Sequence, residues 1–473
     1  MVEYKISQPE YKERSFDEVV QSDNSEDVQK LASEYRSMIY SDDVRNGGSI
    51  HACVAFCGNL VIFGAADKYL YALDKSTGAL VWKFLTGDAI ASSVFVDNGS
   101  VFFGSYDGYV YALRATDGSL IWKFRTGDFI FSSPVVAKGI LYIGSADTYL
   151  YALRVDDGTL LWKFKTGNLL TSSARVVGDF VFVPSEDWYV YALDAFTGSL
   201  KWKFRATGIP TELAIVTNSG RSLSRVYREP VEKFEPSVIW FGTWGSDHIY
   251  ALDALTGRLL DHYKAQFTTP CQPLCYGGVL YVGSADQHMY AIESRGGRVL
   301  WKLYTGGMIS ASSWIQNGIV YFGSYDQYVY AARACDGKPL WKFRTDGVIT
   351  ASPVMDGNVL YVGSWDTYMY VIDTANRKLL WKFKTNAPPS VPSFVDTMST
   401  FSRIKRVISR WWKPEQSRMK VYDTQMKPVQ SDSGAGSYRM SNPYKSDIKY
   451  ESQGLPGYQM GKEKKDLREP WKR

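Results

Sequence analysis

A tryptophan recurs in this chain at a fixed spacing of 40 residues, and this repeat restricts the fold more than any other feature. Its positions are Trp82, Trp122, Trp162, Trp202, Trp301, Trp341 and Trp381. One further copy has Asp261 in the tryptophan position, 59 residues after Trp202, so its unit contains an insertion, at approximately 218–236. Eight units with a period near 40 predict a propeller.

Each unit is predicted to supply four antiparallel strands. In the third unit these are residues 129–136, 140–145, 149–154 and 160–165, and Gly158 provides the positive φ of the last turn. The final strand alternates apolar and mostly basic residues with period two. A single blade cannot bury both faces, so blades must stack around an axis. We therefore predict an all-β, eight-bladed β-propeller over residues 48–396.

The outer hairpins carry the pattern Ala-x-Asp-x-x-Thr-Gly-x-x-x-Trp, as in ALDKSTGALVW (72–82) and ALDAFTGSLKW (192–202). This pattern resembles the tryptophan-docking repeat of pyrroloquinoline-quinone-type propellers. That family includes quinoprotein alcohol dehydrogenases and the eight-bladed lipoprotein of bacterial outer-membrane assembly. The resemblance covers about 48–386 and is closest in style to the non-enzymatic scaffold members. It implies a fold and leaves function open, because enzymes and scaffolds share the repeat.

Two residues of this pattern vary together. Asp at the third position goes with Thr at the sixth, as in Asp74 and Thr77, whereas Arg at the third goes with Asp at the sixth, as in Arg114 and Asp117. This exchange predicts that a carboxylate–hydroxyl hydrogen bond is replaced by an ion pair across the turn. Such an exposed pair contributes only about 0–1 kcal/mol.

The two ends of the chain differ in charge from the repeat region. Residues 1–47 hold 11 acidic and 6 basic side chains and are predicted to form an acidic, partly helical arm. Residues 397–473 hold 17 basic and 8 acidic side chains, with a basic amphipathic helix predicted at 397–414 and a disordered tail at 415–473. No apolar signal segment or membrane-length run is present in the sequence. We expect a cytoplasmic protein, with peripheral association with a membrane as an open alternative.

Two rings of side chains follow from the repeat. Lysines recur at one position of the outermost strand, which indicates either a belt for nucleic acid or anionic lipid, or protection of edge strands against pairing. Aromatic residues recur near the turn between the second and third strands: Tyr106, Trp188, Trp244, Tyr325 and Trp365. They are candidate partner-binding anchors, and packing between adjacent turns is the equal alternative.

The sequence offers little for catalysis. Cys53 and Cys57, like Cys271 and Cys275, stand four residues apart, about 13 Å along a strand, which is too far to share one metal ion without a bend. None of the five cysteines is adjacent to another, although the resemblance would imply an adjacent pair, calcium-binding acids and a catalytic Asp in a quinoprotein enzyme. We therefore predict no catalytic residue, no metal and no cofactor.

These features favour a non-enzymatic scaffold for protein–protein interaction, with terminal arms that engage partners or a membrane surface. A quinoprotein-like, cofactor-binding oxidoreductase is the first alternative. Nucleic-acid binding through the belt and tail is the second, although we expect no specific nucleic acid because the propeller region is nearly neutral, with 31 basic and 30 acidic residues.

Residues 399–413 (STFSRIKRVISRWWK) place Phe401, Ile404, Ile408 and Trp411 on one helical stripe, with Trp412 beside it. This pattern suits either the surface of an anionic membrane or docking on the propeller. If the helix binds membrane, the full chain should co-sediment with anionic vesicles, and Trp411→Ala/Trp412→Ala should abolish this. If it docks, the double variant should instead lower the melting temperature and vesicles should be ignored.

Overall fold

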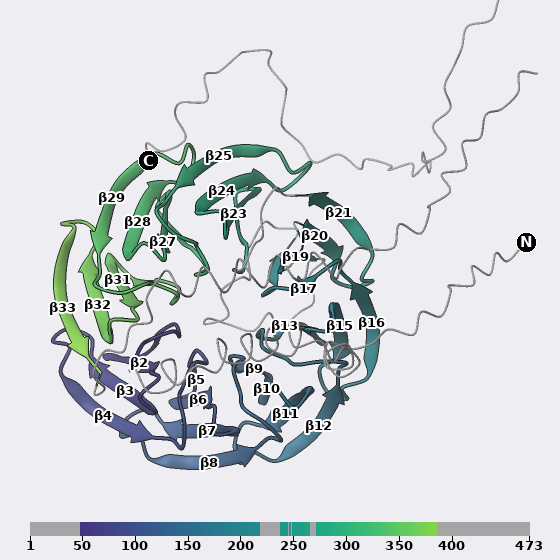
Figure 1. Ribbon diagram of the computed structural model, residues 1–473. Helices are drawn as coiled ribbons and strands as arrows, with labels where there is room; N and C mark the ends of the chain where they lie inside the picture. Colours follow the sequence, from purple (N-terminus) through teal and green to yellow (C-terminus); the bar gives the residue numbers. More distant parts are fainter. Residues whose placement is uncertain (1–47, 218–236, 245, 247, 265–270, 386–473) are drawn as a thin grey trace, which may run out of the picture. The chain divides into compact units, whose positions relative to one another are not determined.

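The computed structural model describes residues 48–217, 237–244, 246, 248–264 and 271–385. Their strands form eight separate sheets that follow one another in sequence order around a ring (Figure 1). This confirms the predicted eight-bladed propeller. The predicted acidic arm, the insertion at about 218–236, the amphipathic helix and the basic tail lie outside the described residues.

Seven blades have four strands each, in simple antiparallel order. The innermost strands are β1 (Ala55–Cys57), β5 (Phe95–Asp97), β9 (Val135–Ala137), β13 (Arg175–Val177), β22 (Leu274–Tyr276), β26 (Trp314–Gln316) and β30 (Val354–Asp356). The second strands are β2 (Leu60–Gly64), β6 (Ser100–Gly104), β10 (Ile140–Gly144), β14 (Phe180–Pro184), β23 (Val279–Gly283), β27 (Ile319–Gly323) and β31 (Val359–Gly363).

The third strands are β3 (Tyr69–Asp74), β7 (Tyr109–Arg114), β11 (Tyr149–Arg154), β15 (Tyr189–Asp194), β24 (His288–Glu293), β28 (Tyr328–Arg333) and β32 (Tyr368–Asp373). The outermost strands, on the circumference in Figure 1, are β4 (Leu80–Leu85), β8 (Leu120–Arg125), β12 (Leu160–Lys165), β16 (Leu200–Arg205), β25 (Val299–Tyr304), β29 (Pro339–Arg344) and β33 (Lys378–Lys384). Blade 5 contains β17 (Ile209–Pro210), β18 (Ala214–Thr217), β19 (Ser237–Trp244), β20 (His248–Asp253) and β21 (Leu259–Lys264), with both β17 and β18 paired to β19.

The third blade shows which parts of the strand prediction were right. Its outer hairpin, β11 and β12, has the predicted bounds, but the innermost strand is short, Val135–Ala137, instead of 129–136. Two physical facts shorten it. Pro134 has no backbone N–H for a sheet, and the hydroxyl of Ser132 donates to the Gly144 carbonyl at 2.7 Å and accepts from its N–H at 3.0 Å. The residues before β9 therefore form an irregular segment near the axis.

Six of the seven repeating tryptophans donate their indole N–H to a backbone carbonyl of the next blade. The Trp122 indole donates its N–H to the Val155 carbonyl at 2.7 Å, and its ring lies against Gly158, which has φ +72°. A Cβ atom at Gly158 would come within 2.6 Å of the indole, so any larger residue would push the ring away. The same indole–carbonyl bond joins five further pairs: Trp82–Ala115, Trp162–Ala195, Trp202–Ala254, Trp301–Ala334 and Trp381–Lys75.

Blade 5 keeps this contact with a different residue. Asp261 occupies the tryptophan position, but Tyr263, two residues later on β21, donates its hydroxyl to the Ser294 carbonyl at 2.6 Å. The Tyr263 ring lies against Gly297 and stacks on Trp240 at a centroid distance of 5.9 Å. A tyrosine two residues along the same face therefore replaces the missing indole.

The ring closes between the first and last blades, which are adjacent at the purple and yellow-green ends of the colour scale in Figure 1. Trp381 of β33 docks on the Lys75 carbonyl at 3.1 Å, and the Thr385 hydroxyl donates to the Gly48 carbonyl at 2.7 Å. Two segments of the sequence, one beginning at Ile50 and the other at 387–396, are candidates for the innermost position of this junction. The segment beginning at Ile50 leads into β1, whereas 387–396 lies outside the described residues.

A second contact repeats beside the tryptophan. Asp107, in the turn between β6 and β7, accepts the Tyr111 hydroxyl at 2.7 Å and the backbone N–H of Gly87 from the preceding blade at 2.7 Å. Burial, together with this carboxylate, raises the pKa of Tyr111. Equivalent Asp–Tyr pairs occur at Asp67–Tyr71, Asp147–Tyr151, Asp187–Tyr191, Asp286–Tyr290, Asp326–Tyr330 and Asp366–Tyr370.

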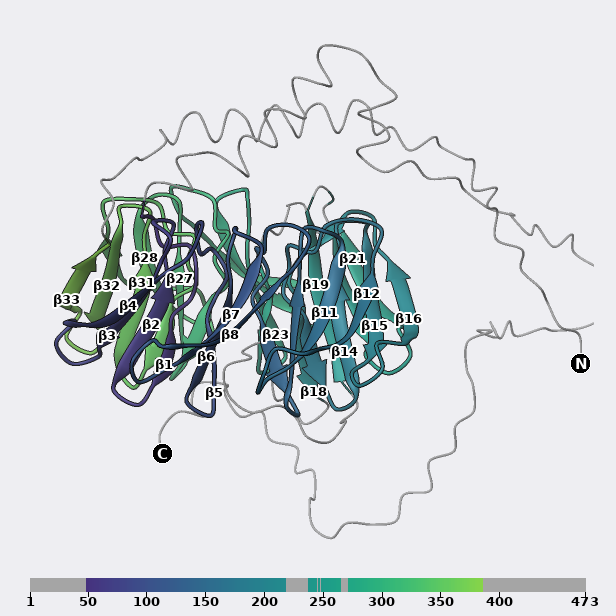
Figure 2. The ribbon, with the colours of Figure 1, turned by 90° about the horizontal axis from the view of Figure 1, so that it is seen from below.

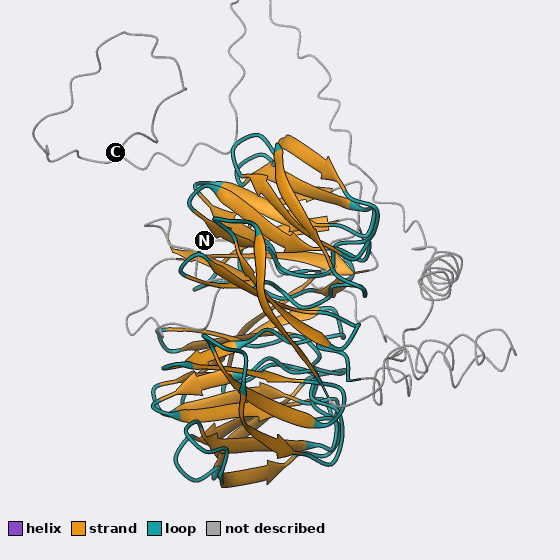
Figure 3. Cartoon of the chain, turned by 90° about the vertical axis from the view of Figure 1, so that its left-hand side faces the viewer, coloured by secondary structure: helices purple, strands orange, loops and turns teal. Residues whose placement is uncertain are grey.

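The outer lysines lie over tyrosine rings of their own blades. Lys163 Nζ is 4.5 Å from the Tyr149 ring centroid, and Lys342 is 4.1 Å from that of Tyr328. The predicted turn exchange is confirmed. The Thr77 hydroxyl donates to the Asp74 carboxylate at 2.9 Å, whereas Arg154 pairs with Asp157 at 3.1 Å. Viewed from the side, every described element is a strand, turn or loop (Figures 2 and 3), and none of the described residues forms a helix able to span a bilayer.

Neighbouring positions of β8 should differ sharply in their effect on stability. Trp122 is 8% exposed, whereas Lys123 lies over Tyr109 at 4.6 Å on the outer surface. We expect Trp122→Ala to cost about 3–5 kcal/mol, and Lys123→Ala to cost about 0.5–1 kcal/mol. Thermal unfolding monitored by circular dichroism checks this, and equal melting shifts for the two variants would contradict the docking role of the indole.

Candidate functional site

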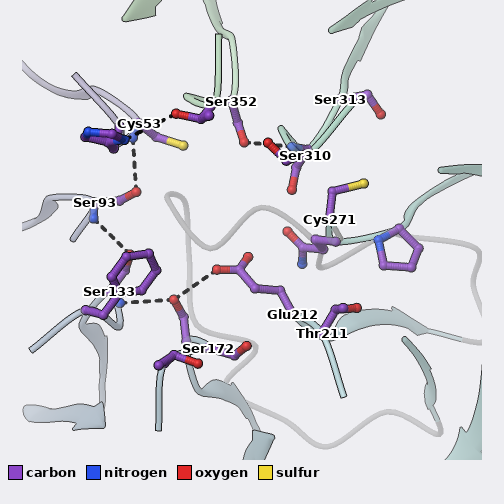
Figure 4. A pocket seen from close by; sticks show the side chains of 18 of the residues that line it. Cys53, Ser93, Ser133, Ser172, Thr211, Glu212, Cys271, Ser310, Ser313 and Ser352 are labelled. Atoms are coloured by element: carbon purple, nitrogen blue, oxygen red, sulfur yellow. Dashed lines mark hydrogen bonds between the residues drawn. The ribbon is translucent and has the colours of Figure 1, made fainter. Parts of the chain in front are cut away.

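A cavity of about 470 Å³ lies on the propeller axis and takes lining residues from all eight blades. Most of them come from the segments that precede the innermost strands. Figure 4 shows hydroxyl and thiol side chains from successive blades around this space, among them Ser93, Ser133, Cys53 and Cys271. The irregular segment that shortened β9 therefore has a clear role, because it brings polar side chains to the axis.

Serine side chains link the blades around the cavity into a polar belt. The Ser93 hydroxyl accepts the Cys53 N–H at 3.1 Å, and the Ser133 hydroxyl accepts the Ser93 N–H at 2.9 Å. The Ser173 hydroxyl in turn accepts the Ser133 N–H at 3.1 Å. Across the ring, the Ser352 hydroxyl accepts the Ser312 N–H at 2.9 Å. We call these residues the serine belt: Cys53, Ser93, Ser133, Ser173, Ser312 and Ser352. The dashed lines in Figure 4 follow part of it.

The sequence signal for the serine belt was present but was not used. A serine recurs with the same 40-residue period at 93, 133 and 173 and again at 312 and 352. A period of 40 that keeps a small polar residue on an inner segment indicates a position facing the axis. The tryptophans alone determine the blade count, so the outer hairpins are predicted without these serines.

Blades 4 and 5 interrupt the belt with charged side chains. Arg175 on β13 is 7% exposed. Its guanidinium donates to the Glu212 carboxylate at 3.2 Å and to the Leu213 carbonyl at 3.2 Å. The Ser173 hydroxyl also donates to Glu212 at 3.2 Å. Glu212 thus replaces the serine of the belt, and Arg175 balances its charge, which satisfies the general requirement that buried charges be paired.

A second carboxylate, Glu186, reaches the same cavity from the turn between β14 and β15. The Thr171 hydroxyl donates to it at 2.8 Å. Burial raises the pKa of Glu186, and the Thr171 hydrogen bond opposes that rise only in part. Neither carboxylate nor Arg175 was among the sequence-based candidates, because a single charged residue in one blade produces no repeating signal.

The other titratable groups around the cavity are held in their neutral forms. Burial lowers the pKa of His51 to about 4, and its Nε2 lies 3.0 Å from the Ser49 hydroxyl. Burial also raises the pKa of the Cys53 thiol, and that of Cys271 to about 12. At neutral pH these thiols remain protonated and are weak nucleophiles. The described cysteines are all free thiols, and no group of three or more potential metal ligands occurs among the described residues.

Two of the candidate anchor aromatics, Tyr106 and Tyr325, are buried. Tyr106 is 6% exposed and packs edge-on against Phe129, and Tyr325 is 8% exposed. For these two tyrosines, the alternative of packing between adjacent turns is the better description.

The other candidates differ in position. Trp244, Tyr325 and Trp365 belong to one cluster, and Trp244 and Tyr325 line the cavity. The Trp365 indole donates to the Thr350 hydroxyl at 2.8 Å. Trp188 is half-buried at the turn before β15, with φ +75°. Trp411 and Trp412 lie outside the described residues. A partner-binding role for any of them stays a prediction.

The cavity can bind a ligand, but its described lining includes few groups suited to bond-breaking chemistry. Four serine hydroxyls of the belt already accept hydrogen bonds from neighbouring blades, and burial favours the neutral forms of the thiols and the histidine. One side of the wall is ionic, with Arg175, Glu186 and Glu212, and the remainder includes the aromatic residues Phe131, Trp244, Trp314 and Tyr325. A polar cavity with aromatic walls is typical of a recognition site.

Eight four-stranded blades, most of them docked on the next blade through a tryptophan, surround a polar axial cavity and define a β-propeller of the pyrroloquinoline-quinone-like class. The sequence profile of the family described as outer membrane protein assembly factor BamB matches residues 66–221, 214–315 and 305–408. The chain therefore belongs to that family. No curated protein sequence matches it.

Solved structures show the same fold at low identity. The computationally designed Ika8 protein has 19% identity and a TM-score of 0.58, with 69% of this chain and 97% of that chain covered. A quinohemoprotein alcohol dehydrogenase from Comamonas testosteroni has 14% identity and a TM-score of 0.56, with 73% and 76% covered. Another from Pseudomonas putida HK5 has 15% identity and a TM-score of 0.54, with 69% and 70% covered. These similarities concern the fold alone.

Proposed function

We propose that this protein is a non-enzymatic scaffold that binds a protein partner at the mouth of its axial cavity. The observation that carries the proposal is that partly exposed aromatic side chains line the cavity. Phe131 is 41% exposed, Trp244 and Trp314 are half-buried, and all three line the cavity. Partly exposed aromatic side chains beside a polar recess are the common anchors of protein interfaces.

The chemistry of the cavity supports binding over catalysis. A serine nucleophile needs an adjacent base to accept its proton, whereas Ser93, Ser133 and Ser352 accept hydrogen bonds from backbone N–H groups of neighbouring blades. His51, with its pKa lowered to about 4, is a weak base at neutral pH. A family described as an assembly factor is compatible with this role, and the dehydrogenases with the same fold keep an oxidoreductase as the alternative.

The terminal segments are proposed as additional contact regions. Residues 1–47 are acidic and 397–473 are basic, so the two ends of the chain attract different partners. The basic segment at 399–413 suits an anionic membrane surface. The propeller region itself has almost no net charge, which makes a general nucleic-acid interface around its circumference the weaker proposal.

Photo-cross-linking tests where the partner binds. Benzoylphenylalanine in place of Phe131 should give a discrete covalent adduct with one protein in cells that express the full chain. Phe196, 50% exposed on the turn between β15 and β16, is the matched control and should give none. An adduct at Phe196 with none at Phe131 would place the interface on the outer edge and contradict the proposal.

Incubation with pyrroloquinoline quinone and Ca²⁺ tests the enzymatic alternative. We expect no stoichiometric retention of the quinone after gel filtration and no alcohol oxidation. The reason is that the polar groups around the axis are already bonded between blades, and the five cysteines include no adjacent pair. Retention of one quinone per chain would overturn the scaffold assignment.

A further inference from the structure

Glu186 is unusual for its place in the propeller. Glu186 stands directly before the turn aspartate and lines the axial cavity, and in six other blades the residue at this position is uncharged: Ala66, Tyr106, Ala146, Ala285, Tyr325 and Trp365. In blade 5 the residues between β19 and β20 are described only in part. A carboxylate at this position therefore has no counterpart in the structural repeat, and blade stability does not require it.

The surroundings of Glu186 are those of a binding site for a cation. Among the described residues, Thr171 is the one side chain that hydrogen-bonds to its carboxylate, at 2.8 Å. The blades on either side contribute Phe131 and Trp244 to the same cavity. Aromatic faces attract cations, and a carboxylate in the same cavity can add a charge-assisted hydrogen bond.

The charge balance of the cavity points the same way. Arg175 pairs with Glu212 at 3.2 Å, so these two charges cancel locally. His51 is neutral because burial lowers its pKa to about 4. Glu186 is then the one carboxylate of the described lining that has no described ion-pair partner, and a cation bound beside it would stabilise its ionised form against the effect of burial. A ligand that brings one positive charge would neutralise the cavity, whereas an anion would be repelled.

We propose that the cavity mouth at Glu186 binds an arginine side chain of the partner protein. Arginine fits better than lysine, because a planar guanidinium can bond a carboxylate with two N–H groups and stack on aromatic rings at the same time. A cavity of about 470 Å³ falls within the usual size range of small-ligand pockets. This inference rests on the proposed scaffold function and specifies the chemistry of the partner.

The decisive comparison uses two peptides that differ only in charge. Acetyl-Gly-Arg-Gly-amide and its citrulline analogue have nearly the same shape, but citrulline is neutral. Titrated into the full chain and followed by calorimetry, the arginine peptide should bind about tenfold more tightly, equivalent to about 1.4 kcal/mol. The lysine peptide should fall between the two.

Three variants test which residues bind the arginine peptide. Glu186→Gln retains an acceptor for the Thr171 hydroxyl and should remove the preference for arginine over citrulline without lowering the melting temperature. Glu293→Gln, which removes an exposed carboxylate paired with Arg298 at 3.2 Å, should change nothing. Phe131→Ala should weaken the arginine peptide severalfold, because it removes one aromatic wall.

The outcomes separate this inference from the proposed function. Equal binding of the arginine and citrulline peptides, or an arginine preference that survives Glu186→Gln, overturns the arginine site. In that case an adduct from the benzoylphenylalanine at position 131 would still support the scaffold function. Absence of that adduct would count against the scaffold function itself, whatever the peptides do.

Discussion

The contact between a tryptophan and the turn of the next blade is the interaction on which the rest of the propeller depends. In the Trp122 pair, one indole buries its face on Gly158 and donates its N–H to Val155 at 2.7 Å, so a single side chain fixes both the distance and the angle between two sheets. Positive φ at the glycine allows the ring to approach the backbone, since a Cβ there would clash at 2.6 Å. Blade 5 shows how strong this requirement is. With Asp261 in place of the indole, Tyr263 donates its hydroxyl to the Ser294 carbonyl from the next position on the same face, in place of the indole N–H bond.

The repeat is strict at the circumference and relaxed near the axis. Outer positions must satisfy the same docking contact in every blade, whereas axial side chains meet one another across a cavity and can differ. The serine belt keeps the repeat through blades 1 to 4, and blade 5 then replaces serine with Glu212, which Arg175 neutralises. The charged residues of the cavity lie in blades 4 and 5, so one side of the cavity wall is ionic and the other is not.

The same fold serves enzymes and binding proteins, so the distinction between them depends on the axial groups. In this chain, burial raises the pKa of the thiols of Cys53 and Cys271 and lowers that of His51. These shifts reduce the reactivity of each group near neutral pH. Hydroxyls that join blades stabilise the ring and are less available for other chemistry. The aromatic residues at the mouth, by contrast, keep part of their surface accessible, as the 41% exposure of Phe131 illustrates.

The sequence by itself determined the blade number, the outer hairpins and the hydrogen-bond exchange between Asp74–Thr77 and Arg154–Asp157. Each of these depends on residues close together in the chain or separated by a constant period. Tertiary structure alone decided the docking role of Tyr263, the burial of Tyr106 and the cavity that joins Glu186 to Phe131 and Trp244. These features arise where residues from different blades converge on the axis or on a neighbouring turn. Their identities vary from blade to blade, so no period marks them, and only the closed ring brings them together.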